Sequence, residues 1–224
     1  MFNTLNKHYT NVVVKPFLKW YLKKPRGYKH GNLTLKIYPG VFHPAYFFST
    51  LFFSDYLNTL ELKNKMFCEV GAGSALISFR ALEKGARVVA LELSEVAIKG
   101  IKENIQANEL DSSKITVVHS DLFDSIPSKQ FDVVFINPPY FFKDITDVGS
   151  LAWNCGTNGQ YFSKLFTQLG DYVHEKSDIY LTLAENCEIE RISDIGNKSG
   201  WYLMCEQEKK IKWEKNFIFK LNRK

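Results

Sequence analysis

The segment Asn137-Pro138-Pro139-Tyr140 has the residue types needed to hold a planar NH₂ group. Two consecutive prolines lack N–H groups, so after a strand they end the hydrogen-bond ladder and leave carbonyls unpaired. The Asn137 side-chain oxygen and the Pro138 carbonyl can accept the two hydrogens of an NH₂ group, and Tyr140 can stack on its plane. These four residues predict a catalytic site for transfer to nitrogen. Proximity, orientation and stabilisation of positive charge by the Asn137 oxygen would promote that transfer without a strong base.

A glycine-containing turn lies between a predicted buried strand and a predicted helix. The run from Glu69 to Ser74 reads Glu-Val-Gly-Ala-Gly-Ser, and Gly71 and Gly73 allow a tight turn against which a ligand can lie. A dinucleotide fingerprint needs a third small residue, but position 76 is Leu. S-adenosylmethionine has no phosphate and needs a partner for its ribose, so the turn favours this cofactor over NAD.

Acidic residues follow the next two predicted strands. Glu92 can accept hydrogen bonds from both ribose hydroxyls. Asp121 can accept from the adenine amino group, while Leu122 packs on the ring. The complete set of predicted cofactor contacts is Glu69, Gly71, Gly73, Glu92, Leu93, Asp121, Leu122 and Asn137. No metal site is predicted.

Short apolar runs alternate with longer amphipathic stretches from Lys65 onward, which is typical of a parallel sheet with crossover helices. We expect an α/β, Rossmann-like fold with a mostly parallel seven-stranded sheet and a C-terminal antiparallel strand. The expected strands cover residues 33–38, 66–70, 87–91, 115–119, 131–137, 179–184, 201–206 and 212–221, and the expected helices cover 74–84, 94–108, 161–174 and 188–197. We expect the strand order 3-2-1-4-5, in which the strand that begins at Met66 is strand 1. In this order the glycine turn and Asn137 meet at the switch point of the sheet, where ligands bind.

Charge is distributed unevenly along the chain. The first 54 residues carry eight basic side chains and no acidic one, so of the total charge of +5 the remaining residues carry −3. This distribution indicates a basic, aromatic N-terminal extension, which we place at residues 1–60. The S-adenosylmethionine-dependent methyltransferase domain expected from the motifs above would then cover residues 61–224. The arm from Lys15 to Arg26 suits an anionic partner such as RNA or a membrane surface. It can equally be solvated, or a helix packed on the domain.

The cysteines and the apolar segments point to the cytoplasm. Cys68, Cys155, Cys187 and Cys205 lie far apart and form no Cys-x-x-Cys pair, which indicates a reduced protein without structural zinc. The start of the chain lacks the pattern of a secretory signal. The longest apolar stretch, Val41 to Phe53, is too short and too interrupted to span a membrane.

With these residues assembled, the chain resembles the class I S-adenosylmethionine-dependent methyltransferases of the HemK-like group, which methylate a glutamine side chain in translation release factors. The resemblance covers residues 65–184, with 69–73 similar to the group's cofactor loop and 137–140 to its acceptor signature. Residues 147–159 are similar to its tryptophan-and-glycine loop, although Cys155 stands where glycine is usual. Aromatic residues replace the usual carboxylate within His43 to Thr50.

This resemblance implies an N-methyltransferase for a planar NH₂ group, with a protein glutamine, in a partner that could be related to translation, as the first choice. Methyltransferases for adenine-N6 or guanine-N2 in RNA or DNA carry the same four-residue signature, because a base amine is also a planar NH₂. Nucleic acid is therefore the alternative partner. A small-molecule acceptor and a non-catalytic cofactor-binding subunit also stay open, and the oligomeric state is not specified.

Overall fold

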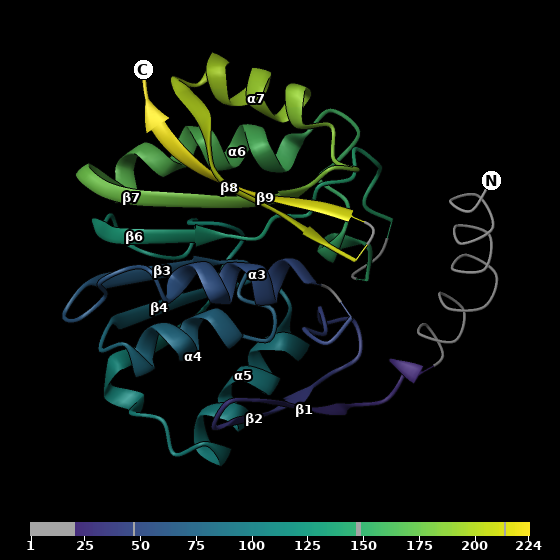
Figure 1. Ribbon diagram of the computed structural model, residues 1–224, viewed down its shortest axis with the longest axis vertical. Coiled ribbons are helices and arrows are strands. Elements are labelled where there is room, and N and C mark those ends of the chain that lie inside the picture. The colour runs from purple at the N-terminus through teal and green to yellow at the C-terminus, as the bar shows by residue number, and fades with distance from the viewer. Residues whose placement is uncertain (1–20, 47, 147–148, 213) are drawn as a thin grey trace.

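The computed structural model describes residues 21–46, 48–146, 149–212 and 214–224, and its centre is a seven-stranded sheet (Figure 1). The strand order is β5-β4-β3-β6-β7-β9-β8. The strands are β3 (Met66–Val70), β4 (Arg87–Glu92), β5 (Ile115–His119), β6 (Phe131–Ile136), β7 (Val173–Ala184), β8 (Trp201–Ile211) and β9 (Glu214–Arg223). Neighbours from β5 to β7 are parallel, and β9 is antiparallel to both β7 and β8. The predicted Rossmann-like sheet is confirmed.

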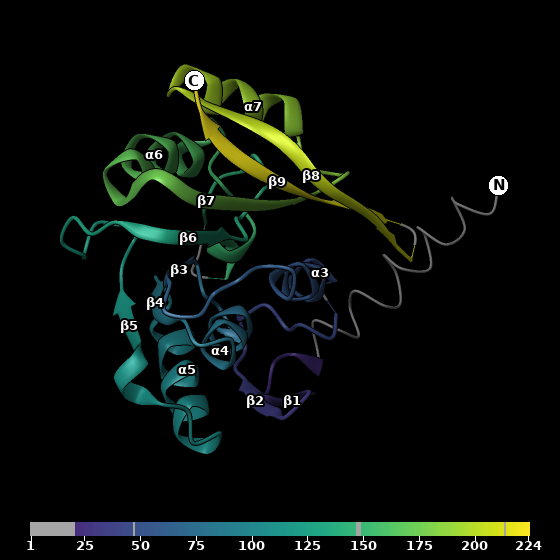
Figure 2. The same cartoon turned by 60° about the vertical axis from the view of Figure 1, so that its left-hand side comes forward.

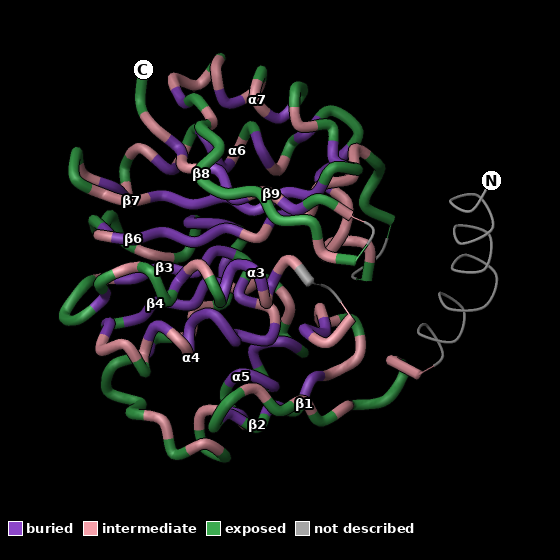
Figure 3. The backbone as a smooth tube through the Cα atoms, viewed as in Figure 1, coloured by how far each residue is buried: buried purple, intermediate pink, exposed green. Residues whose placement is uncertain are grey.

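Helices cover both faces of the sheet (Figure 2). The helices α3 (Phe48–Leu57), α4 (Leu76–Glu83) and α5 (Glu95–Ala107) lie on one face, and α6 (Gln160–Leu169) and α7 (Ile189–Lys198) on the other. Because side chains alternate along a strand, Phe67 packs in the α3–α5 core and Cys68 in the α6–α7 core. Short 3-10 turns lie at Ser112–Lys114, Ser150–Ala152 and Gly170–Tyr172. Figure 3 shows the buried backbone concentrated in the sheet and on the helix sides that face it.

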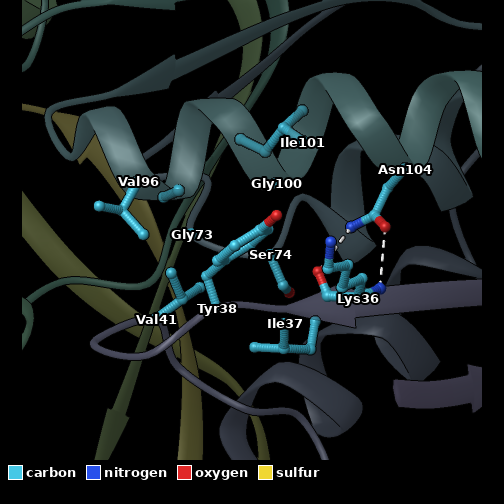
Figure 4. Close-up of a pocket in the computed structure, with 11 residues that line it drawn as sticks. Lys36, Ile37, Tyr38, Val41, Gly73, Ser74, Val96, Gly100, Ile101 and Asn104 are labelled. Atoms are coloured by element: carbon cyan, nitrogen blue, oxygen red, sulfur yellow. Dashed lines mark hydrogen bonds between the residues drawn. The ribbon is translucent and has the colours of Figure 1, made fainter. Parts of the chain in front are cut away.

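A β-hairpin precedes the main sheet and is fixed to helix α5. It consists of β1 (Arg26–His30) and β2 (Leu33–Ile37). The apolar residues of β2 are buried and alternate with exposed polar residues, as predicted. The Asn104 side chain on α5 accepts from the Lys36 N–H at 2.8 Å and donates to the Lys36 carbonyl at 3.1 Å (Figure 4). A side-chain amide therefore pairs with β2 as a neighbouring strand would.

The expected boundaries are wrong in two regions of the chain. The helix expected to reach His174 ends at Leu169, because Gly170 begins a 3-10 turn and β7 starts at Val173. The charged residues Glu208, Lys209 and Lys210 were expected to separate two strands but lie within β8, which turns into β9 near Lys212 at a φ of 57°. The edge strand β8 is mostly exposed, so charged side chains fit there and protect it from further pairing.

The expected N-terminal extension is described only from Tyr21 onward, and the earlier part of the basic arm lies outside the described residues. Leu35 of β2 and Phe53 of α3 share a core with Phe67 of β3. A domain division at residues 60 and 61 stays a prediction.

In the part of the chain that the structure describes, no helix has the length and apolarity to cross a membrane.

Candidate functional site

The turn between β3 and α4 adopts the backbone conformation that glycine favours. Gly71 and Gly73 have φ angles of 73° and 51°. The N–H groups of Gly71 and Ala72 both donate to the Leu91 carbonyl at 2.9 Å, so the turn wraps over the carboxyl end of β4. A Cβ atom built on Gly71 would meet no atom within 4 Å. The backbone at Gly71 is thus open to a ligand.

Glu92 connects this turn to the start of α5. Its Oε2 accepts from the Gly73 N–H at 2.6 Å and its Oε1 from the Ser94 N–H at 2.7 Å. Burial raises the pKa of the Glu92 carboxyl, and the backbone N–H groups oppose that shift. Each carboxylate oxygen keeps an accepting lone pair, which suits the ribose hydroxyls of S-adenosylmethionine. Leu93, beside it, is 38% exposed, and its predicted contact with the cofactor remains a prediction.

Glu69 is turned away from the open side of the turn. Glu69 is 6% exposed, and its Oε2 accepts from both the Ser78 N–H, at 2.8 Å, and the Ser78 hydroxyl. Burial raises the pKa of Glu69 to about 8, and the nearby Glu92 adds to the shift. In this arrangement Glu69 anchors α4 behind the glycine turn, and its direct contact with a cofactor remains a prediction.

The loop after β5 contains an ion-pair cluster. Asp121 and Asp124 each accept from the Lys164 Nζ at 2.6 Å. An adenine amino group would therefore share the Asp121 carboxylate with Lys164. Leu122 has a φ of 54° and is 5% exposed, with its side chain in the α6–α7 core. The predicted contacts of Asp121 and Leu122 with adenine remain predictions.

Asn137, which is predicted to hold the methyl acceptor, lies directly after the end of β6. Its Nδ2 donates to the Thr50 hydroxyl on α3 at 3.4 Å, which leaves Oδ1 as the accepting atom of the amide. Among the described residues, neither Asn137 Oδ1 nor the Pro138 carbonyl accepts a hydrogen bond. Two accepting oxygens are therefore unpaired at this point, as the sequence predicts for an NH₂ group.

Strand register places this segment beside the glycine turn. Val70 of β3 pairs with Ile136 of β6 in parallel register. Gly71 and Asn137 are the next residues of the two strands, so they leave the sheet side by side. The expected meeting of cofactor loop and acceptor segment at the switch point agrees with this register.

Tyr140, three residues after Asn137, lines a cavity of about 150 Å³. Burial raises the pKa of the Tyr140 hydroxyl, with a further contribution from Glu214. The lining residues come from α3, β7, β9 and the segments beside them: Tyr46, Ser49, Tyr140, Thr182, Leu183, Ala184, Ile211, Lys212, Glu214 and Asn216. A second hollow, between β2 and α5 behind Gly73, has about 10 Å³ and is large enough for about one water molecule (Figure 4).

A loop rich in aromatic residues closes this end of the sheet. The Phe141 N–H donates to the Trp153 carbonyl at 2.9 Å, and the Trp153 ring packs on Phe42 with centroids 4.2 Å apart. Gly156 and Gly159 have φ angles of 84° and 71°, whereas Cys155 is not left-handed and is fully buried. A cysteine is therefore compatible with the backbone where glycine is usual in the similar loop.

Sequence reasoning missed Thr50, Phe42 and Lys164 at this site. Thr50 and Phe42 belong to an apolar stretch without a clear period, so nothing indicated their direction. Lys164 was one of several polar residues on an expected helix. In the described residues, no group of three or more His, Cys, Asp or Glu side chains is placed to hold a metal ion.

Comparison with known proteins gives relatives that act on proteins. The chain is 37% identical over 110 residues to a provisionally assigned protein N5-glutamine methyltransferase of Methanocaldococcus jannaschii, covering 49% of this chain and 52% of that protein. It is 27% identical over 188 residues to the ribosomal protein L11 methyltransferase of Thermotoga neapolitana, covering 81% and 61%. The matches thus span less than two thirds of either relative.

A solved structure and a family model agree with the fold. The 16S rRNA guanine-N2 methyltransferase of T. thermophilus, solved with S-adenosylmethionine and guanosine, has a TM-score of 0.60 and 17% identity. That match covers 88% of this chain and 50% of the other. The family model described as methyltransferase small domain matches residues 32–154, more than half of the chain. This chain is therefore an S-adenosylmethionine-dependent methyltransferase and belongs to the methyltransferase small domain family.

Proposed function

We propose that this methyltransferase methylates a planar NH₂ nitrogen, and that the acceptor is a glutamine side chain of a protein. One observation carries the proposal: the unpaired Asn137 Oδ1 and Pro138 carbonyl lie next to the glycine turn. Two oxygens with this spacing along the chain can each accept one hydrogen of an NH₂ group. The nitrogen lone pair is then directed away from both oxygens.

Bound S-adenosylmethionine supplies an electrophilic methyl group on sulfur. As the N–C bond forms, the S–C bond breaks and its electron pair stays on sulfur, and the nitrogen then loses one proton to solvent. Asn137 and Pro138 orient the amide and bind its N–H groups more strongly as positive charge grows on nitrogen. The Thr50 hydroxyl accepts from the Asn137 Nδ2, and in this orientation of the amide Oδ1 is available to the acceptor. No basic side chain is needed.

The M. jannaschii relative supports a glutamine acceptor, because its printed activity is N5-glutamine methylation and its match covers about half of this chain. A nucleic-acid base is the second candidate. It is favoured by the basic first 54 residues and by the fold shared with an rRNA methyltransferase. The two candidates use the same chemistry at nitrogen and differ in the molecule that carries it.

A cytoplasmic location belongs to the same proposal. Cys68, Cys155 and Cys187 are free and buried, and Cys205 is free and exposed. Unpaired thiols of this kind are usual in reducing compartments.

The test combines purified protein, S-adenosylmethionine with a labelled methyl group, and cell extract. Half of each sample is digested with protease and half with nuclease before the label is separated by size. We expect the label in protein, and in N5-methylglutamine after complete hydrolysis by proteases. Label confined to nucleotides would overturn the glutamine assignment and support the second candidate.

Asn137→Ala tests the role of the acceptor segment. We expect turnover to fall about 100- to 1,000-fold, as when a single donor or acceptor of a charge-stabilising site is removed, while cofactor binding stays measurable. Asn58→Ala is the matched control, because Asn58 is exposed at the end of α3 and accepts from Arg80. Equal activity in both variants would contradict the assigned role of Asn137.

A further inference from the structure

The cavity beside Tyr140 adjoins the proposed acceptor site. Ile136 pairs with Leu181, so the following residues, Asn137 and the cavity-lining Thr182, are neighbours in the sheet. Ser49, also in the wall, precedes Thr50, which accepts from Asn137. A side chain that enters the cavity thus passes the two unpaired oxygens.

Glu214 places a carboxylate in the wall of this cavity. Side chains alternate along β9, and Glu214 shares a face with the buried Asn216 and Ile218, on the side of the sheet that α3 covers. The Asn216 Nδ2 donates to the Glu214 carbonyl at 3.4 Å. This bond fixes the Glu214 backbone at the start of β9, and Glu214 is one of the residues that line the cavity.

Glu185 is the charged neighbour that affects the pKa of Glu214. Burial raises the pKa of Glu214, and Glu185 raises it further. Glu214 in turn contributes to the raised pKa of Tyr140. Lys212 is the basic residue among those that line the cavity. The wall therefore contains one carboxylate and one ammonium group, and the carboxylate offers a partner to a cation.

The volume indicates how much of an acceptor can enter. Pockets for whole drug-sized ligands have about 300–1,000 Å³, so a cavity of about 150 Å³ is suited to a single side chain or base. A nucleic-acid base would bring its phosphates close to the Glu214 carboxylate in this wall. A protein side chain brings no such charge.

Resting on the proposed function, we propose that this cavity receives the acceptor side chain and that Glu214 selects protein segments with Lys or Arg next to the methylated glutamine. The basic neighbour would pair with the Glu214 carboxylate at the mouth of the cavity. Glu214 is thus a specificity-determining residue, separate from the groups that hold the NH₂.

The experiment uses the full chain, labelled S-adenosylmethionine and two pools of short synthetic peptides with a central glutamine. One pool has Lys or Arg at the flanking positions and the other has Asp or Glu there. We expect the wild-type protein to prefer the basic pool about fivefold in kcat/KM, with the difference in KM. Glu214→Gln should remove this preference, and Glu214→Lys should reverse it.

Glu208→Gln is the matched control, because Glu208 lies on the same hairpin, is exposed and pairs with Lys215. It should keep the wild-type preference. Thermal unfolding of each variant shows which of them is folded. If Glu214→Lys does not fold, Glu214→Gln, which keeps the shape of the side chain, tests the inference alone. An unchanged peptide preference in Glu214→Gln would overturn this inference and leave the proposed function standing. Absence of label from both peptide pools, with label in a parallel RNA sample, would overturn the proposed function and this inference together.

Discussion

Glu92 accepts a hydrogen bond from the Gly73 N–H at 2.6 Å, so the carboxyl end of β4 holds the glycine turn that follows β3. The same carboxylate binds the Ser94 N–H at the start of α5. Both ends of the predicted ribose site therefore depend on one side chain. Its two oxygens would bind backbone and ligand at once.

Glu92→Gln should weaken cofactor binding. An amide keeps one accepting oxygen and replaces the other with an NH₂ group, which cannot accept from Gly73 or from a ribose hydroxyl. Hydrogen bonds to charged groups contribute about 1.5–3 kcal/mol, so we expect the affinity for S-adenosylhomocysteine to fall about 10- to 100-fold. Isothermal titration calorimetry measures this, with Glu95→Gln on the exposed first turn of α5 as control. Equal affinity of the two variants would show that Glu92 does not bind the ribose.

Thr50→Val should reduce turnover without removing it. The variant keeps the size of the side chain and loses the hydroxyl that accepts from Asn137 at 3.4 Å. Because this bond is long, we expect it to contribute about 1 kcal/mol to the orientation of Asn137, which corresponds to about a fivefold lower kcat. Single-turnover kinetics with saturating cofactor measure it. In an Asn137→Ala background, Thr50→Val should have no further effect, and an additive loss would exclude this positioning role.

The two carboxylates bound to Lys164 allow the adenine contact to be tested. Asp121 follows β5 directly and Asp124 lies one turn later, and both accept from Lys164 at 2.6 Å. Asp121→Asn should lower cofactor affinity about 5- to 10-fold, because an adenine amino group loses a charged acceptor. Asp124→Asn breaks an equivalent ion pair and should change affinity less than about twofold. A similar loss in both variants would mean that the ion pairs, and not an adenine contact, support binding.

Sequence pattern predicted the sheet order because each parallel strand is a short buried run that ends in a turn. Once Val70 and Ile136 end neighbouring strands, Gly71 and Asn137 must meet. The alternation of side chains also explains Glu69. It shares a face with Phe67, toward α3 and α4, while Cys68 and Val70 point to α6. Its carboxylate therefore meets Ser78, which strand position alone did not indicate.

Helix α3 and the packing of Phe42 on Trp153 could not be predicted in this way. The stretch that contains Phe42 and α3 is mostly apolar, and its few polar residues, such as His43, Ser49 and Thr50, show no period that distinguishes helix from strand or loop. The acceptor cavity was missed for another reason. Glu214 and Tyr140 are far apart in sequence, and β9 reaches β7 only by returning antiparallel after β8. Such neighbours depend on tertiary pairing, which local pattern does not encode.

Glu69 should make stability depend on pH. Its folded pKa of about 8 is well above the ordinary glutamate value of 4.5, so the folded state holds a proton that the unfolded state releases. This contribution is fully present below pH 4.5 and is lost as pH rises through about 8, when a charge must form in a buried site. The change in the free energy of unfolding between pH 5 and 8 is on the order of 3 kcal/mol.

Glu69→Gln isolates this effect, because its oxygen can still accept from the Ser78 N–H and hydroxyl while it carries no titrating proton. Urea unfolding at several pH values from 5 to 8 gives the free energy of unfolding of both proteins. We expect the wild-type value to fall relative to that of Glu69→Gln as pH rises. Glu95→Gln, at an exposed position, should follow the wild type. Parallel curves for wild type and Glu69→Gln would mean that Glu69 is already ionised in the folded protein, and its bonds to Ser78 would then be those of a carboxylate throughout this range.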